Sequence, residues 1–246
     1  MDYAEYGRPG GKRVSPEEFI QQASPRFREK GIFPYCEACG QRVDPYGVHT
    51  PGGPRRFDHV NLPKDADPLD DCILANRNSK FKGMHPSSFD SEHGKQLREN
   101  FFDPENLKRT YCFMWKFCGA GNFPIKSLIK TLERADKKRI WSYSGIPLWT
   151  IPYILLTLDN FIHNNKYGKN YNFHFFIQKN KSSCLDDLWS GRSKNTLRKV
   201  FTDSGRLIEK ATPQNPLPIT EANFIEFSSD NSWIEQKYID IVLKYR

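Results

Sequence analysis

The sequence lacks any run of 18 consecutive apolar residues, which is the length that a membrane-spanning helix needs. Its first residues, Met1 to Glu5, also lack the basic and apolar regions of a secretory signal peptide. We therefore expect a cytoplasmic protein without a membrane partner. Thiols stay reduced in the cytoplasm, so the six cysteines are not expected to form a disulfide framework.

The chain has only one Cys-x2-Cys pair, Cys36 and Cys39, and no second pair to match it. Two thiolates at this spacing can bind one tetrahedral zinc ion, and Gly40 allows the turn after the second cysteine to close. A thioredoxin-like redox site would need a helix that opens at the first cysteine, which residues 40–45 do not favour. The pair therefore predicts a structural zinc site.

The remaining zinc ligands must come from elsewhere, because structural zinc sites are four-coordinate. One histidine follows the pair at a distance typical of zinc ribbons, and one further cysteine is the only other nearby thiol. We therefore predict a closed Cys3His site, with His49 as the alternative histidine. The predicted ligands are Cys36, Cys39, His59 and Cys72.

Acidic residues are scarce in the middle of the chain. Residues 105–210 hold 19 Lys and Arg but only 8 Asp and Glu. The net positive charge of this segment is therefore larger than the net charge of +8 that the whole chain carries. A concentrated positive field attracts polyanions, and the aromatic rings between the cations could stack on unpaired bases. We therefore predict nucleic acid as the partner, with DNA favoured, and infer no small-molecule substrate. The predicted contact residues are Lys137, Lys138, Arg139, Lys179, Lys181, Arg198 and Lys199.

Two of these features have simpler alternatives. Lys137–Arg139 could be a solvated helix end, where cations interact favourably with the C-terminal helix dipole. The aromatic face of a predicted strand at Tyr171–Gln178 could be ordinary hydrophobic core, because aromatic residues favour half-buried strands.

Glycine and proline divide the chain into segments that differ in organisation. Ser15-Pro16-Glu17-Glu18 predicts a capping box that starts a short helix, whereas the residues before it predict a loose tail. The apolar run Ile151–Leu158 predicts a buried strand. We predict an α+β protein with a tail and short helix (1–30), a zinc-ribbon-like module (31–90) and a basic α+β domain with a short mixed sheet (91–246).

The cysteine pair and a later tetrapeptide resemble a known zinc ribbon. Cys36-x2-Cys39-Gly40 followed by Arg56-Phe57-Asp58-His59 resembles the N-terminal zinc ribbon of the competence protein CoiA family and of related zinc-ribbon proteins of bacterial mobile elements. That family typically has His-Phe-x-His in the second stretch. Arg56 replaces the first of these histidines, which makes Cys72 the natural fourth ligand. The resemblance implies a nucleic-acid-binding zinc protein in a mobile-element or phage-defence context.

CoiA-like proteins also carry a restriction-endonuclease-like domain after the ribbon. Such a domain needs an aspartate at the end of one strand and Glu/Gln-x-Lys in the next to hold a divalent metal. Asp159 would end the predicted strand here, but Gln178-Lys179 lacks the required spacing. We therefore assign no catalytic residue on this basis.

An HNH nuclease is the enzymatic alternative. Asp58-His59-Val60 resembles the Asp-His-Ile of that motif, in which the histidine activates water. Asn76, or alternatively Asn78, would be the middle asparagine and His85 the final metal-binding histidine, with Mg²⁺ or Mn²⁺ as the cofactor. His59 cannot be a zinc ligand and a general base at once, so the two hypotheses compete. A protein–protein adaptor that docks through the zinc ribbon is a third hypothesis.

Overall fold

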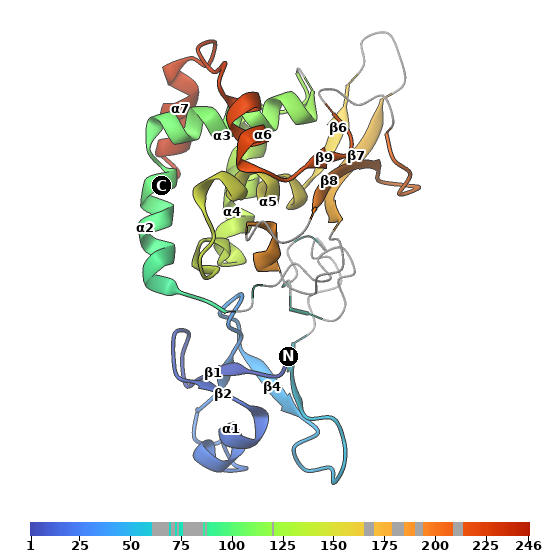
Figure 1. Ribbon diagram of the computed structural model, residues 1–246. Helices are drawn as coiled ribbons and strands as arrows, with labels where there is room; N and C mark the ends of the chain where they lie inside the picture. The colour runs from blue at the N-terminus through green and yellow to red at the C-terminus, as the bar shows by residue number, and fades with distance from the viewer. Residues whose placement is uncertain are drawn as a thin grey trace. The chain divides into compact units, whose positions relative to one another are not determined.

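The computed structural model describes residues 1–60, 69, 72, 74–75, 86, 88–119, 121–164, 170–178, 185–189, 194–208 and 214–246 (Figure 1). The chain divides into two compact units, Met1–His85 with Lys137–Arg139, and Pro86–Asp136 with Ile140–Arg246. Helices and small antiparallel sheets occur together, which confirms the predicted α+β class. No helix in the described ranges has the length and apolar character that a membrane span requires.

The first unit contains two small antiparallel sheets. In one sheet β1 (Ala4–Tyr6) lies between β2 (Arg13–Val14) and β3 (Pro34–Tyr35). In the other, β4 (Val43–Tyr46) pairs with β5 (Arg56–His59). The prediction of a loose N-terminal tail was wrong, because the chain reverses between β1 and β2 and the two strands pair.

The reversal depends on glycine. Gly7 and Gly10 have φ angles of +74° and +77°, a left-handed conformation that other residues adopt at a cost. The buried Glu5 carboxylate accepts a hydrogen bond of 2.8 Å from the Gly10 amide, which fixes the turn against β1.

The single helix described in the first unit, α1 (Pro16–Ala23), begins as predicted. Ser15 is the N-cap and forms a reciprocal capping box with Glu18, and Pro16 occupies the first turn. The helix buries Phe19, whose ring lies 5.2 Å from that of Phe27 and 6.1 Å from that of Phe57. These three rings form the main apolar cluster of a unit built mostly from turns and short strands.

The second unit begins with helices and continues into a sheet. The helices that precede the sheet are α2 (Ser91–Phe101), α3 (Pro104–Cys118), α4 (Ile125–Lys137) and α5 (Ile151–Thr157). The sheet has the order β6 (Asn160–His163), β7 (Tyr171–Gln178), β8 (Thr196–Phe201) and β9 (Leu217–Pro218). The helices α6 (Glu221–Ser228) and α7 (Gln236–Leu243) follow it. Every pairing among the described strands of this sheet is antiparallel, so the prediction of a mixed sheet was wrong.

The segment predicted as a strand at Ile151–Leu158 forms helix α5 instead (Figure 1). All seven residues of α5 are buried, and α5 packs against β7, where Phe173 and Phe175 face the core. A short apolar run does not distinguish a buried strand from a buried helix by periodicity. Pro152 lies in the first helical turn, where its missing N–H has no intrahelical partner to lose.

A buried ion pair ties the end of α5 to α4. Asp159 and Arg134 have side chains that are only 6% and 4% exposed, and Oδ1 of Asp159 accepts a 2.6 Å hydrogen bond from Nη1 of Arg134. Lys130, on the same helix and half-exposed, reaches the same oxygen at 3.2 Å. Asp159 therefore follows a helix and neutralises cations, which is not the strand-end metal ligand that the CoiA comparison requires.

We expect Asp159→Ala to destabilise the second unit by about 3–5 kcal/mol, because it leaves the buried Arg134 charge without its partner. Lys130→Ala removes a solvent-exposed partner of the same carboxylate and should cost at most about 1 kcal/mol. Urea unfolding followed by tryptophan fluorescence measures both. Equal effects of the two substitutions would contradict the assigned role of the buried pair.

Candidate metal centre

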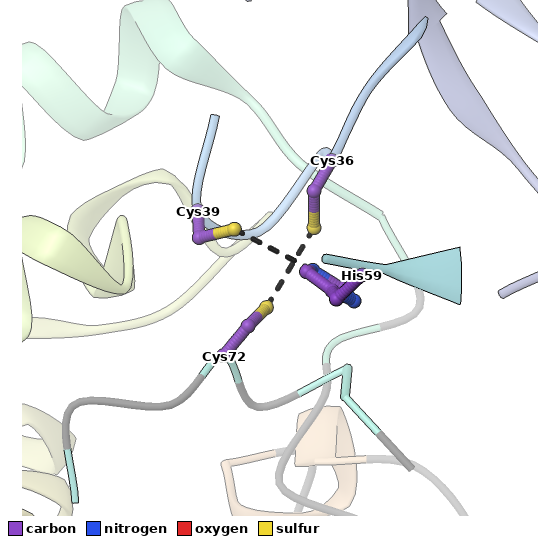
Figure 2. Close-up of side chains that lie close together, drawn as sticks. All are labelled: Cys36, Cys39, His59 and Cys72. Carbon is purple, nitrogen blue, oxygen red and sulfur yellow. Dashed lines mark hydrogen bonds between the residues drawn. The ribbon is translucent and has the colours of Figure 1, made fainter. Parts of the chain in front are cut away.

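Four side chains of the first unit converge on one point. Cys36 and Cys39 lie on the turn after β3, His59 ends β5, and Cys72 comes from further along the chain. Their ligand atoms all lie within 4.8 Å of one another, and Figure 2 shows the three sulfurs and the imidazole directed at a common centre. The predicted Cys3His set is therefore assembled in the structure.

The distances match a tetrahedral zinc site. Sγ of Cys36 lies 3.6 Å from Sγ of Cys72, and Sγ of Cys39 lies 3.6 Å from Nε2 of His59 (Figure 2). Zinc binds sulfur at about 2.3 Å and nitrogen at about 2.0 Å, so tetrahedral angles separate two sulfurs by about 3.8 Å and a sulfur from a nitrogen by about 3.6 Å. A disulfide needs about 2.05 Å between sulfurs, so these cysteines are free thiols.

The local backbone explains how the cysteine pair reaches the centre. The amide of Gly40 donates to the carbonyl of Cys36 at 2.8 Å, and Gly40 has a φ of +66°, so the chain turns back immediately after Cys39. The antiparallel pairing of β4 with β5 then places His59 opposite Val43, a few residues after this turn. The hairpin thereby returns the histidine to the cysteine turn.

Backbone amides complete the surroundings of two sulfurs. The Ala38 amide donates to Sγ of Cys36 at 3.3 Å, and the Leu74 amide donates to Sγ of Cys72 at 3.4 Å. Both bonds join a cysteine to the second residue after it, so the two turns present sulfur in the same way. Such bonds stabilise thiolates. Sequence reasoning did not identify these amides, since a backbone donor has no residue-type signature.

The three thiols also interact electrostatically. Contact with the Cys39 and Cys72 sulfurs, together with burial, raises the pKa of the Cys36 thiol well above its usual range. Hydrogen bonds from Cys36 and Cys72 lower the pKa of Cys39. A bound dication would supply the positive charge that three adjacent thiolates need.

The structure also separates the candidate histidine ligands. His49 is exposed and lies outside the cluster, whereas His59 is part of it. Arg56, at the position where the CoiA family has a histidine, pairs with Asp58 at 2.7 Å. His59 is held against Cys39, which disfavours it as the general base of an HNH site. The other residues of that hypothesis, Asn76 or Asn78 and His85, lie outside the described residues.

Several of the predicted nucleic-acid contacts occupy interior positions. Lys138 is 2% exposed and Lys199 is 6% exposed. The Lys199 ammonium donates to the carbonyls of Phe117 and Cys118 at the C-terminal end of α3 and lies 4.0 Å from the centre of the Phe173 ring. Burial lowers the pKa of Lys199. Assigning Lys138 and Lys199 as phosphate contacts was therefore wrong, because neither side chain faces solvent.

The other predicted cations differ in position. Arg139 pairs with the buried Glu5 at 3.2 Å and donates to the Glu37 carbonyl at 2.8 Å, within the first unit. Arg198 is half-buried, and its Nε lies buried without a hydrogen-bond partner. Lys137 is exposed at the end of α4. Lys179 and Lys181 lie outside the described residues.

Comparisons of the chain with protein-family models, with curated proteins and with solved structures found no match. The four-residue centre and the charge of the chain are therefore the features that bear on its function.

We expect His59→Ala and Cys72→Ser each to reduce the bound zinc well below one ion per chain, because three ligands cannot close a tetrahedral structural site. His49→Ala and Cys112→Ser are matched controls, since these residues lie outside the cluster. Zinc content of the purified variants, measured by atomic emission, distinguishes the two pairs. Full zinc occupancy in His59→Ala would contradict the assignment.

Proposed function

We propose that this chain is a zinc-containing nucleic-acid-binding protein in which one Zn²⁺ has a structural role. The observation that carries the zinc assignment is the set of four ligand atoms within 4.8 Å of one another. Three cysteines and one histidine would occupy all four coordination positions of a tetrahedral zinc ion, which leaves none for a substrate or an activated water. Structural zinc therefore fits this site better than catalytic zinc.

A structural ion would also add stability that the small apolar core of the first unit does not provide. The described strands there have two to four residues and α1 has eight, so little apolar surface is buried. Domains of this kind are commonly stabilised by a metal or by disulfides. The ion would join the β3 turn, the end of β5 and the segment around Cys72, which are far apart in the sequence.

The nucleic-acid part of the proposal is supported by charge. The net charge of +8 comes entirely from the middle of the chain. Some of those cations are internal, but Lys126 and Lys137 on α4 are exposed and can meet a phosphate backbone. The kinship with CoiA-type ribbons, and the mobile-element context that it implies, remains a prediction. So does the adaptor hypothesis, which a failure to bind nucleic acid would favour.

We expect removal of the metal by a strong chelator to increase amide hydrogen exchange in the first unit and to leave the second unit unchanged. All five tryptophans, Trp115, Trp141, Trp149, Trp189 and Trp233, belong to the second unit. Tryptophan fluorescence is therefore an internal control, while exchange mass spectrometry follows the first unit. Added Zn²⁺ should restore protection and Mg²⁺ should not. Unchanged exchange after verified zinc removal would refute the structural role.

We expect the double variant Lys126→Glu/Lys137→Glu to weaken binding to single-stranded or duplex DNA by at least about tenfold at low salt and to flatten the salt dependence, since phosphate contacts release counterions. Lys237→Glu/Lys244→Glu changes the net charge equally on α7 and at its C-cap, outside the basic middle, and should have a much smaller effect. Fluorescence anisotropy across a salt series measures both. Equal losses in the two variants would contradict a localised interface.

A further inference from the structure

The second unit contains a pocket of about 660 Å³ that the zinc site does not use. This volume lies within the range of small-ligand pockets in proteins, about 300–1,000 Å³. Two indole rings, Trp149 and Trp189, belong to its lining, together with the apolar side chains of Leu188 and Ile219. Lys194 and Glu221, both exposed, add one charge of each sign.

Residues outside the pocket contact the residues that form its aromatic walls. The Trp149 ring packs edge-on against the buried Tyr153, with ring centres 6.2 Å apart. The Tyr153 hydroxyl in turn donates to the Thr220 carbonyl at 2.9 Å, which links this wall to the start of α6. Trp189 follows the short helical turn Leu185–Leu188, and its amide donates to the Asp186 carbonyl. Because the Trp149 ring is supported in this way, little ordering cost remains for a ligand that stacks on it.

The lining chemistry selects a class of ligand. Indole faces stack on planar aromatic rings, and base stacking on aromatic side chains tolerates any base. Lys194 can donate hydrogen bonds and Glu221 can accept them, and neither has an ion-pair partner among the described residues. An aliphatic ligand would use the apolar walls but gain nothing from these two polar groups. A nucleobase has both the aromatic face and the hydrogen-bonding edge, and Lys194 can also meet its phosphate.

We propose that this pocket receives an unpaired nucleobase of a single-stranded nucleic acid, with Trp149 or Trp189 stacking on the base. This inference rests on the proposed nucleic-acid function and names the element that it would recognise.

The test compares two labelled oligonucleotides of equal length, oligo(dT) and an abasic strand with the same phosphates but no bases. Anisotropy with the full, zinc-loaded chain should show at least about fivefold tighter binding to oligo(dT), the lower end of what stacking of one base contributes. Trp149→Leu and Trp189→Leu should each reduce this preference. Trp233→Leu, which removes an exposed tryptophan outside the pocket, should retain it.

The outcomes separate the two proposals. Equal binding of both strands by the wild type would overturn the pocket assignment while leaving the nucleic-acid function in place. If neither strand binds and a duplex of the same length does not bind either, the nucleic-acid function fails, and titration with thymidine monophosphate then decides the pocket alone. Quenching of tryptophan fluorescence in the wild type but not in the double Trp149→Leu/Trp189→Leu variant would support it, and no quenching would overturn it.

A variant that fails to fold would give no information, so circular dichroism is measured for each. Lys194→Glu is a surface alternative that needs no core rearrangement, because Lys194 is exposed. It should weaken oligo(dT) binding more than Lys244→Glu, which makes the same charge change on the exposed end of the chain. Equal effects of these two variants would count against a role for Lys194 in the pocket.

Discussion

The convergence of three thiols and one imidazole is the interaction on which the first unit depends. Its strands are short and its apolar cluster consists mainly of Phe19, Phe27 and Phe57, so hydrophobic burial has little surface to act on. Bringing three thiolates to a common centre is unfavourable unless a cation neutralises their charge. A bound dication would convert this electrostatic cost into a cross-link between the cysteine turn, β5 and Cys72.

The second unit is stabilised in a different way. Helix α5 is buried on all sides and packs on the aromatic face of β7, where Phe173 and Phe175 lie. Two buried charges of this core are partnered: Arg134 meets Asp159, and Lys199 meets the carbonyls at the end of α3. Buried cations need such partners because desolvation of an unpaired charge is costly. Part of the basic excess of the sequence therefore serves the fold.

This division of the cations narrows the proposed nucleic-acid interface. Net charge predicts the attraction of a polyanion, but it does not say which side chains reach solvent. Lys126, Lys137 and Lys194 are exposed, whereas Lys138 and Lys199 are not. The pocket beside Trp149 and Trp189 lies in the same unit as most of the charge, so phosphate attraction and base stacking could act on the same strand.

The sequence alone determined the local features: the Ser15 capping box, the cysteine turn at Cys36–Cys39 and the α+β class. These depend on residues adjacent in the chain, whose chemistry is fixed by spacing. The tertiary structure decided the choice of His59 over His49, the helical state of Ile151–Thr157 and the burial of Lys138 and Lys199. Each of these depends on which distant segments pack together, and that packing sets solvent exposure and pairing independently of local propensity.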